Sequence, residues 1–403
     1  MSRVRNLTDR TLPWVATSGR LGEGVVKFVK CVLDDGTSGE AQFASTVCFL
    51  VAVFDGDDGP LEQPMVVKFN MDDELTRNWL HLNEQFRNEV LVYEKVLPFL
   101  DRDKRINNIF PRYFYGYASE SEDPSKYTII LEDLRKSGYK LSPEFIDLDF
   151  AHCALAFKKL GAFHALSFAA KQSNLKGFTD IVESLIESRL FEHNWEDADY
   201  LYSGSVDRAA GPLLKNGEKV AEINNFKNKL KNSYVYFKNL LTVNEPMGVI
   251  CHGDFCRNNV LYKYDNGSPI DIKFFDLATA RYGSPMLDFT FFFFLNCSEK
   301  SRKLNRDEFL QIYHHALSTS IPGLQVPSLE DFKEEFRQKA VYGFLICSFF
   351  KPALMDPVPF DPVKESRNSV EVRGRRVLHN GGEKATEVIS NMLRELIELK
   401  YEL

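Results

Sequence analysis

The sequence predicts an α+β fold with two lobes, a small β-rich N-terminal lobe with one main helix and a larger, mostly helical C-terminal lobe. The 403 residues exceed the size of one average domain. Short runs rich in β-branched and aromatic residues dominate residues 1–134, whereas helical periodicity dominates residues 135–403. We therefore expect a hinge between the lobes at about residues 131–134.

Five strands and one main helix are expected in the N-terminal lobe. The first three strands, separated by short turns, indicate an antiparallel meander. In the helix, expected over residues 76–97, apolar residues recur at three- and four-residue steps, and Pro98 is expected to end it. The expected strands span residues 25–33, 46–54, 65–69, 113–117 and 127–131.

The C-terminal lobe is expected to be helical except for a small β section at residues 248–276. Residues 150–170 and 220–241 each have the pattern of one long amphipathic helix. A terminal amphipathic helix over residues 385–399 is expected to dock on the chain's own core. A basic cluster is expected in a solvated loop, with partner binding as the lesser alternative; it comprises Arg367, Arg373, Arg375 and Arg376.

Composition excludes several classes of protein. A formal net charge of −7 and a pI of about 5.7 disfavour binding to nucleic acid or to an anionic membrane. No apolar run is long enough to span a bilayer, and the first residues lack the apolar core of a secretory signal. Seven scattered cysteines with no CxxC pair suit free thiols in a reducing cytoplasm and give zinc no support.

The segment Cys251-His252-Gly253-Asp254-Phe255-Cys256-Arg257-Asn258-Asn259 is the strongest chemical signal in the sequence. An Asp followed five residues later by an Asn, behind a His, has the spacing of a phosphotransfer loop. Such a loop needs a carboxylate for the attacking hydroxyl and an amide oxygen for magnesium, and Asp254 and Asn259 fit these roles. Asp276, at the end of a short apolar strand, would be a second Mg²⁺ ligand. The alternative is that Asp254 and Asn259 are ordinary turn residues.

Lys68 stands in an otherwise apolar strand, where burying an ammonium group is costly without an anionic partner. Glu89 follows 21 residues later (89 − 68) in the expected helix, the separation of a strand lysine paired with a helix glutamate. Glu84 and Glu94 of the same helix compete for this role. By itself, Lys68 would also fit an edge strand that reaches solvent.

Two further segments are candidates for nucleotide contacts. Gly39 and Ser45 belong to a glycine-bearing turn whose amides and hydroxyl could cover phosphates, although an ordinary hairpin turn fits equally well. Gly22 and Gly24 compete for that role but precede the first strand. At the expected hinge, the backbone groups of the segment Ile129-Ile130-Leu131-Glu132-Asp133-Leu134 could pair with adenine. A Cys/His nucleophile built from Cys251, His252 and Cys256 is rejected, because buried thiols are the commoner state.

With these residues assembled, the chain resembles the ecdysteroid kinase-like family, within the aminoglycoside phosphotransferase and choline kinase superfamily. The resemblance runs from about residue 39 to about residue 294. It rests on the stretches GEAQFASTVCFLVAV, VVKF, FRNEVLVYEKVLP, IILEDL, KLGAFHALSFA, VICHGDFCRNNVLYKYDNG and IKFFDLATARYGSPMLDFTFF. The E-D-L hinge and the RYGSP-x-x-D run are the most specific of these.

The resemblance implies a protein kinase-like fold, use of ATP and Mg²⁺, and a role for each matching residue. Asp288 corresponds to an Asp that braces the catalytic loop, and His164 in the F-H-A helix signature is expected to be a satisfied core residue. Many members have Phe-Gln after the metal-binding Asp, where this chain has Leu277-Ala278. The implied roles are Asp254 as catalytic base, Asn259 and Asp276 as Mg²⁺ ligands, Lys68 with its partner Glu89 on the phosphates, and Ser45 in the phosphate loop. Gly39, Glu132 and Leu134 are candidates from their places in the turn and at the hinge.

The sequence hypothesis is therefore an ATP- and Mg²⁺-dependent O-phosphotransferase that phosphorylates a hydroxyl of an ecdysteroid or a hydroxylated xenobiotic. Two alternatives stay open: a catalytically silent kinase fold that binds nucleotide or a lipophilic ligand, and a kinase of the choline or aminoglycoside type. A protein kinase is disfavoured because no APE-like motif follows Asp276. The expected partner is a small-molecule alcohol, without nucleic acid, membrane or obligate protein partner.

Overall fold

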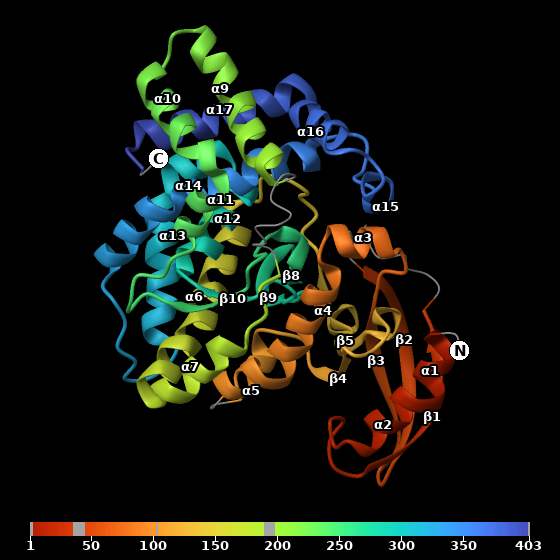
Figure 1. Cartoon of the computed structure of the whole chain (residues 1–403). Coiled ribbons are helices and arrows are strands. Elements are labelled where there is room, and N and C mark those ends of the chain that lie inside the picture. The colour runs from red at the N-terminus through yellow and green to blue at the C-terminus, as the bar shows by residue number, and fades with distance from the viewer. Residues whose placement is uncertain (1–2, 35–44, 102–103, 189–197, 402–403) are drawn as a thin grey trace.

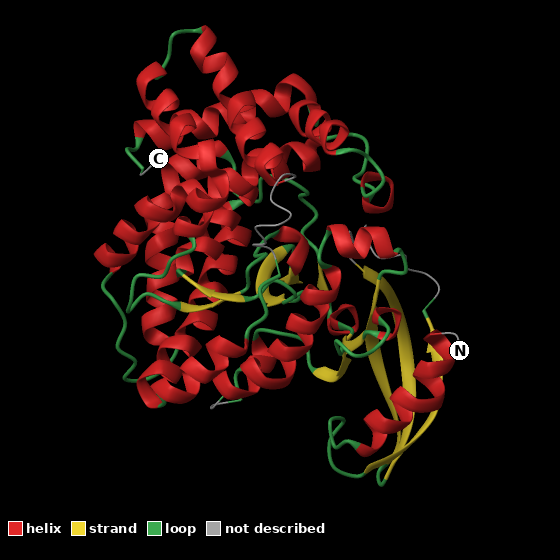
Figure 2. Cartoon of the chain, in the orientation of Figure 1, coloured by secondary structure: helices red, strands yellow, loops and turns green. Residues whose placement is uncertain are grey.

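The structure is a computed structural model that describes residues 3–34, 45–101, 104–188 and 198–401. An antiparallel sheet with short helices forms the N-terminal region, and a larger helical body with two small sheets forms the C-terminal region (Figures 1 and 2). This is the predicted α+β architecture. The chain leaves the large sheet at Glu132, and the lobe boundary at residues 131–134 stays a prediction.

The large sheet has the strand order β1-β2-β3-β5-β4, so the first three strands form the predicted meander and β5 pairs next to β3. Lys68 lies opposite Val47 of β2 and Ile129 of β5, which excludes an edge position for this lysine. Strand β3 is longer than predicted, because it begins at the tight Gly56–Gly59 turn. The strands are β1 (Val25–Leu33), β2 (Ser45–Gly56), β3 (Gly59–Asn70), β4 (Tyr113–Tyr117) and β5 (Thr128–Glu132).

The single helix predicted over residues 76–97 is wrong in its continuity. The structure has α3 (Glu74–Trp79) and α4 (Leu82–Leu91), separated at His81, whose φ of 54° is left-handed. A π-helical turn (Val92–Val96) then leads into α5 (Leu97–Leu100). Pro98 lies in the first turn of α5, where its missing N–H costs no hydrogen bond, so it does not end the helical run.

The core of the C-terminal region surrounds α12 (Pro285–Asn296), whose twelve residues are all buried. Helices α6 (Phe150–Ser173), α13 (Glu299–Thr319) and α14 (Leu329–Met355) pack around it. Their close approach needs glycine: a Cβ on Gly343 of α14 would lie 2.5 Å from the Thr290 carbonyl oxygen. The small sheets comprise β6 (Tyr139–Lys140), β7 (Val249–Cys251), β8 (Val260–Asp265), β9 (Ser268–Phe274) and β10 (Arg281–Gly283).

The remaining helices lie at the periphery, and one of them corrects a second prediction. The helix predicted over residues 220–241 is two helices, α10 and α11, separated by a short 3₁₀ turn at Leu230–Asn232. The remaining helices of the described residues are α1 (Arg3–Asn6), α2 (Leu12–Thr17), α7 (Leu175–Ser184), α9 (Ser205–Lys215), α10 (Val220–Lys229), α11 (Ser233–Leu240), α15 (Pro362–Glu365), α16 (Val370–His379) and α17 (Gly382–Glu398).

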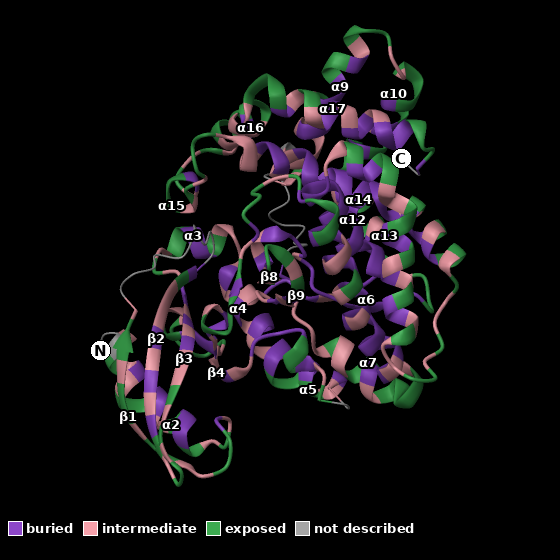
Figure 3. Cartoon of the chain, turned by 180° about the vertical axis from the view of Figure 1, so that it is seen from behind, coloured by how far each residue is buried: buried purple, intermediate pink, exposed green. Residues whose placement is uncertain are grey.

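The solvated loop predicted for the basic cluster is wrong, because three of its four arginines lie in α16. Ser369 caps this helix by accepting a hydrogen bond from the Val372 N–H, a signal that precedes the arginines in the sequence. The terminal helix α17 does dock on the chain's own core, as predicted, because Ile389, Leu393 and Leu396 are fully buried. Buried stretches of α17 are purple in Figure 3.

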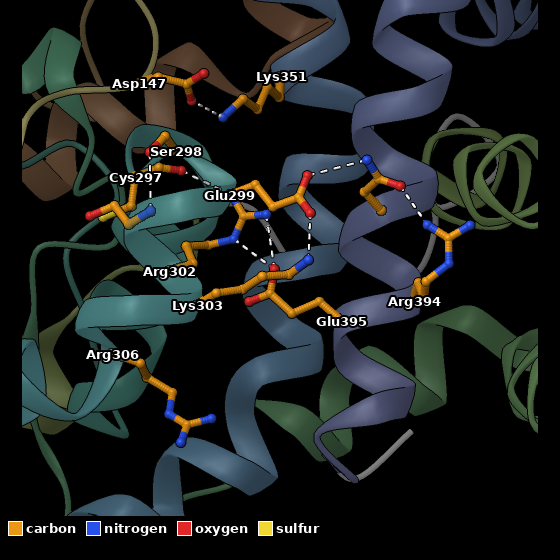
Figure 4. A network of polar contacts seen from close by, with 12 residues as sticks. Asp147, Cys297, Ser298, Glu299, Arg302, Lys303, Arg306, Lys351, Arg394 and Glu395 are labelled. Atoms are coloured by element: carbon orange, nitrogen blue, oxygen red, sulfur yellow. Dashed lines mark hydrogen bonds and ion pairs between the residues drawn. The ribbon is translucent and has the colours of Figure 1, made fainter.

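Buried charges tie α17 and α14 to the ends of α12 and α13 (Figure 4). Arg302 donates to Glu395 Oε2 at 3.0 Å and to the Cys297 carbonyl at 2.9 Å, with 2% and 1% of the Arg302 and Glu395 side chains exposed. Lys351 Nζ lies 2.7 Å from Asp147 Oδ1 and 3.1 Å from the Leu295 carbonyl. These cations therefore bind the carbonyl groups left unpaired at the C-terminal end of α12.

All seven cysteines are free thiols, and Cys153 and Cys297 lie 3.4 Å apart between their sulfur atoms without a bond. Among the helices of the described residues, none is both long and apolar enough to cross a membrane.

Candidate active site

The predicted catalytic loop follows β7 and is folded around Asp254. The Asn259 Nδ2 donates to the Asp254 carbonyl and to Asp254 Oδ2, both at 2.8 Å. Gly253 has a φ of +83°, and a Cβ there would lie 1.9 Å from the Thr279 carbonyl oxygen. The H-G-D order is therefore required locally, because only glycine permits this turn beside residue 279.

Asp288 of α12 holds the start of this loop. Its Oδ2 accepts from the His252 N–H at 2.6 Å and its Oδ1 from the Gly253 N–H at 2.9 Å. His164 Nε2 lies 3.2 Å from Asp288 Oδ2, while its Nδ1 lies 2.9 Å from the Tyr313 hydroxyl. The predicted brace is thus present, and His164 is a satisfied core residue.

His164, Cys251 and Asp288 bring three possible metal-ligand atoms within 4.8 Å of one another. Both carboxylate oxygens of Asp288 already accept backbone N–H groups. Burial lowers the pKa of His164, against the effect of Asp288, so the imidazole is neutral and hydrogen bonded on both nitrogens. These contacts identify the group as a structural network.

Lys68 of β3 lies between two carboxylates. Its Nζ is 2.6 Å from Glu89 Oε2 of α4 and 2.9 Å from Asp276 Oδ1. Burial raises the pKa of Glu89 to about 7, although the Lys68 charge opposes this effect. Burial also tends to lower the pKa of Lys68, but Asp276 and Glu89 raise it above its ordinary value. Lys68 is therefore a cation, and Glu89 is the glutamate of its helix that pairs with it.

The metal-binding Asp predicted at residue 276 is connected to the catalytic loop through the backbone. The Phe275 N–H donates to the Asn259 carbonyl at 3.0 Å, and His252 Nε2 lies 2.9 Å from the Phe275 carbonyl. Asp276 itself has a left-handed φ of 65°, unusual for a residue other than glycine. These contacts fix the backbone on the N-terminal side of the Asp276 carboxylate.

Asn88 is a site residue that the sequence analysis missed. Its side chain is fully buried, and its Nδ2 donates to the Ala278 carbonyl at 3.2 Å and the Ala280 carbonyl at 2.9 Å. Its Oδ1 accepts from the Ile186 N–H at 3.0 Å. Asn88 thereby joins the helix that carries Glu89 to the segment that follows Asp276. The available signal was an amide directly before Glu89 in the same helix.

The predicted phosphate loop and hinge are only partly described. Gly39 lies outside the described residues, and Ser45 is the first residue of β2, paired with Asn70. The Glu132 N–H donates to the Arg112 carbonyl at 2.9 Å, and the Asp133 N–H donates to the Pro64 carbonyl at 3.2 Å. Leu134 is buried and begins a short 3₁₀ turn. Its backbone N–H follows those of Glu132 and Asp133 along the chain.

A cavity of about 800 Å³ lies elsewhere in the helical region, between the end of α6, the start of α14 and residues 244–247. Its lining contains none of the residues placed at the catalytic loop or beside Lys68. Residues 244–247 precede β7, whereas the catalytic loop follows it, so this cavity opens at the opposite end of that strand.

The family match identifies this protein as a kinase, a phosphotransferase with an alcohol group as acceptor. The family model described as "Ecdysteroid kinase-like family" matches residues 39–326, more than two thirds of the chain. The chain belongs to this family, as the sequence motifs predicted. No curated protein matches it significantly.

Solved structures with a similar fold are distant from this chain. The structure titled Plasmodium vivax ethanolamine kinase has 14% identity and a TM-score of 0.41, covering 92% of this chain and 82% of that chain. The GDP complex of wild-type aminoglycoside 2'-phosphotransferase-IIIa has 11% identity and a TM-score of 0.41, with coverages of 90% and 94%. The amicoumacin kinase hAmiN, in complex with AMP-PNP and Ca²⁺, has 10% identity and a TM-score of 0.40, with coverages of 86% and 88%.

Proposed function

We propose that this protein transfers the γ-phosphoryl group of ATP, with Mg²⁺, to a hydroxyl group of an ecdysteroid or a hydroxylated xenobiotic. The observation that carries the proposal is the convergence of three charges: Lys68 contacts both Glu89 and Asp276. The Asp276 segment is in turn hydrogen bonded to the loop that holds Asp254. This arrangement supports phosphoryl transfer, in which positioned charges supply most of the acceleration.

The metal-binding residues in this proposal are Asp276 and Asn259. A carboxylate and an amide oxygen are the donors that Mg²⁺ prefers. The Asn259 Nδ2 is engaged by Asp254, which leaves its Oδ1 as the ligand atom. When bound, the ion would neutralise negative charge on the phosphates. Residues 1–134 would form the nucleotide-binding lobe, with Gly39 and Ser45 near the phosphates, and Glu132 and Leu134 at the adenine.

Asp254 would act as the catalytic base. It would orient the acceptor hydroxyl and accept its proton as the hydroxyl oxygen bonds to the γ-phosphorus. The bond from the γ-phosphorus to the β,γ-bridging oxygen breaks, and ADP leaves with the electron pair. Lys68 would hold the phosphates, and Glu89 would keep the ammonium group aligned.

Two features support the finer parts of this proposal. Membership of the ecdysteroid kinase-like family supports this acceptor class, and a helical lobe rich in phenylalanine suits an acceptor of low polarity. Seven free thiols support a reducing, cytoplasmic location.

The test compares wild type with Asp254→Asn in a ³²P-ATP transfer screen over ecdysteroids, hydroxylated xenobiotics, choline and an aminoglycoside. We expect Asp254→Asn to reduce transfer about 100-fold or more, while thermal shift shows ATP-Mg²⁺ binding unchanged. Asp265→Asn, at the exposed end of β8, is the matched control and should transfer normally. Normal turnover by Asp254→Asn would overturn the assignment. Wild type that binds ATP but transfers to none of these acceptors would favour the silent kinase fold.

A further inference from the structure

A segment that follows the family match reaches from the helical body to the N-terminal lobe. In Figures 1 and 3, which view the molecule from opposite sides, α15 lies directly beside α3, and α16 continues from it into the helical body. We call residues 356–380, which include both helices, the C-terminal clasp. The clasp lies beyond residue 326, where the match to the family ends.

An ion pair forms the centre of this contact. Arg367 of the clasp donates to Asp73 through both terminal nitrogens, at 2.6 Å to Oδ2 and 3.4 Å to Oδ1. Asp73 is also the N-cap of α3, where its side chain accepts from the Thr76 N–H at 2.9 Å. The bidentate geometry fixes the orientation of Arg367 as well as its distance from α3.

A hydroxyl hydrogen bond, a cation–π contact and an aromatic contact extend the interface along α3. The buried Thr76 hydroxyl donates to Ser366 Oγ at 3.0 Å. The Arg373 guanidinium lies 5.0 Å from the centre of the Trp79 ring, and Trp79 packs against Phe360 with ring centres 6.3 Å apart. These contacts all involve the short helix between β3 and α4.

The clasp is hydrogen bonded to the helical body through Arg208. Arg376 pairs with the buried Glu365, which joins α16 to α15. Arg208 of α9 donates to the Val377 carbonyl at 3.0 Å and to the Asn380 carbonyl at 2.8 Å, at the end of α16. A movement of α3 away from the helical body would therefore break the contacts at Arg367 rather than carry the clasp along.

The Arg367–Asp73 contact affects the placement of Lys68 and Glu89 because Asp73 lies between them in the chain. Asp73 lies five residues after Lys68 (73 − 68) and sixteen residues before Glu89 (89 − 73), on the link between the strand and the helix that carry these charges. Asp276, the third member of the cluster, belongs to the other lobe. Holding α3 against the helical body thus holds Lys68 and Glu89 close to Asp276.

We propose that Arg367 and Asp73 are positioning residues for phosphoryl transfer, acting by keeping the two lobes closed around the nucleotide. This inference rests on the proposed function, because it places ATP between the lobes. Opening the clasp reduces the fraction of molecules competent to bind, and apparent ATP affinity falls in proportion to that fraction. Neither residue contacts the reacting atoms.

The experiment compares Arg367→Glu with Arg375→Glu, which makes the same charge change at an exposed position of α16. We expect Arg367→Glu to raise the KM for ATP about five-fold, the upper range for an exposed ion pair, with kcat at saturating ATP little changed. Arg375→Glu should match wild type, and Arg367→Lys, which keeps the charge, should recover most of the affinity. Hydrogen exchange at the α3 amides should quicken in Arg367→Glu alone.

Asp73→Asn provides an independent variant if Arg367→Glu folds poorly. Asparagine is as good an N-cap as aspartate, so α3 keeps its cap while the ion pair is lost. A KM for ATP equal to that of wild type in Asp73→Asn, or equal effects of Arg367→Glu and Arg375→Glu, would overturn the inference. Failure of wild type itself to bind ATP would instead contradict the proposed function.

Discussion

Lys68 and His164 show how burial decides the charge of single residues in this fold. The Lys68 side chain is 11% exposed, yet two carboxylates keep it cationic. His164 is fully buried beside one carboxylate, Asp288, whose oxygens are also bound by two N–H groups, and there burial prevails and keeps the ring neutral. Lys68 contacts two carboxylates and His164 contacts one, which accounts for the opposite directions of their pKa shifts.

The neutral state of His164 makes stability depend on pH. Burial lowers its pKa from 6.5 in the folded state, so the unfolded chain binds the proton more readily. The stabilisation is present above pH 6.5 and is lost as pH falls from 6.5 through the lower pKa of the folded state, so the free energy of unfolding slopes downward over that range. Urea unfolding of wild type at pH 7.5 and pH 5.5 measures this slope.

His164→Gln should unfold more easily at both pH values and show a smaller difference between them. His379→Gln, at an exposed histidine at the end of α16, is the matched control and should keep the wild-type slope. An unchanged slope in His164→Gln would show that another group titrates.

At the scale of elements, α12 positions the catalytic loop at both of its ends. Asp288, in its first turn, binds the His252 and Gly253 N–H groups. Asn296, its last residue, accepts from the Arg257 N–H at 3.1 Å through Oδ1. The two side chains are eight residues apart, about 12 Å along a helix. This buried helix therefore fixes the distance between the two points at which the catalytic loop is attached.

Asn296→Ala tests the second of these attachments. It leaves the buried Arg257 N–H without its partner, so we expect a loss of about 1–3 kcal/mol in the free energy of unfolding. The loop should also lose its fixed end, which should reduce kcat more than it changes the KM for ATP. Asn305→Ala, in the partly exposed part of α13, is the control. Wild-type kcat in Asn296→Ala would show that Asp288 alone suffices.

Local spacing explains which elements could be predicted from the sequence. The catalytic loop and the Lys68–Glu89 pair were predicted because each role requires a residue type at a fixed separation in the chain, whereas the Asp288 brace was implied by the family resemblance. The break at His81 and the helix at residues 370–379 were not, because apolar periodicity continues through the first and the cluster of arginines in the second indicated a solvated loop. The contacts of Asn88 depend on the segment after residue 276, which no local pattern brings near α4.

At the scale of the whole molecule, the lobes meet at several described places, three of which involve residues discussed above. The chain connects them after β5, Asn88 and Lys68 join them at the centre, and the C-terminal clasp joins them through α3. The buried pair Arg302–Glu395 anchors the last helix, α17, to the same helical body. Long-range polar contacts therefore fix how the lobes are arranged, together with an apolar core that both lobes share, in which Phe110 packs against Phe163 and Phe274.

Removing one member of that buried pair should be costly. Glu395→Leu leaves the Arg302 charge buried without its carboxylate, and we expect a loss of about 3–5 kcal/mol in the free energy of unfolding. The double variant Arg302→Met with Glu395→Leu should recover most of this loss, because neither charge then remains in the core. Urea unfolding measures both. A double variant as unstable as the single one would show that the Arg302 contact with the Cys297 carbonyl matters more.

The packing of α14 on α12 determines how much of the chain a fragment must include in order to fold. Phe336 of α14 lies edge-on to Phe289 and Phe293, with ring centres 5.7 and 5.4 Å away. A chain cut at residue 326 would keep every residue that the family match recognises and would expose these rings to water. The stretch by which the family is recognised is therefore shorter than the unit that folds, and an expressed fragment should extend through α17.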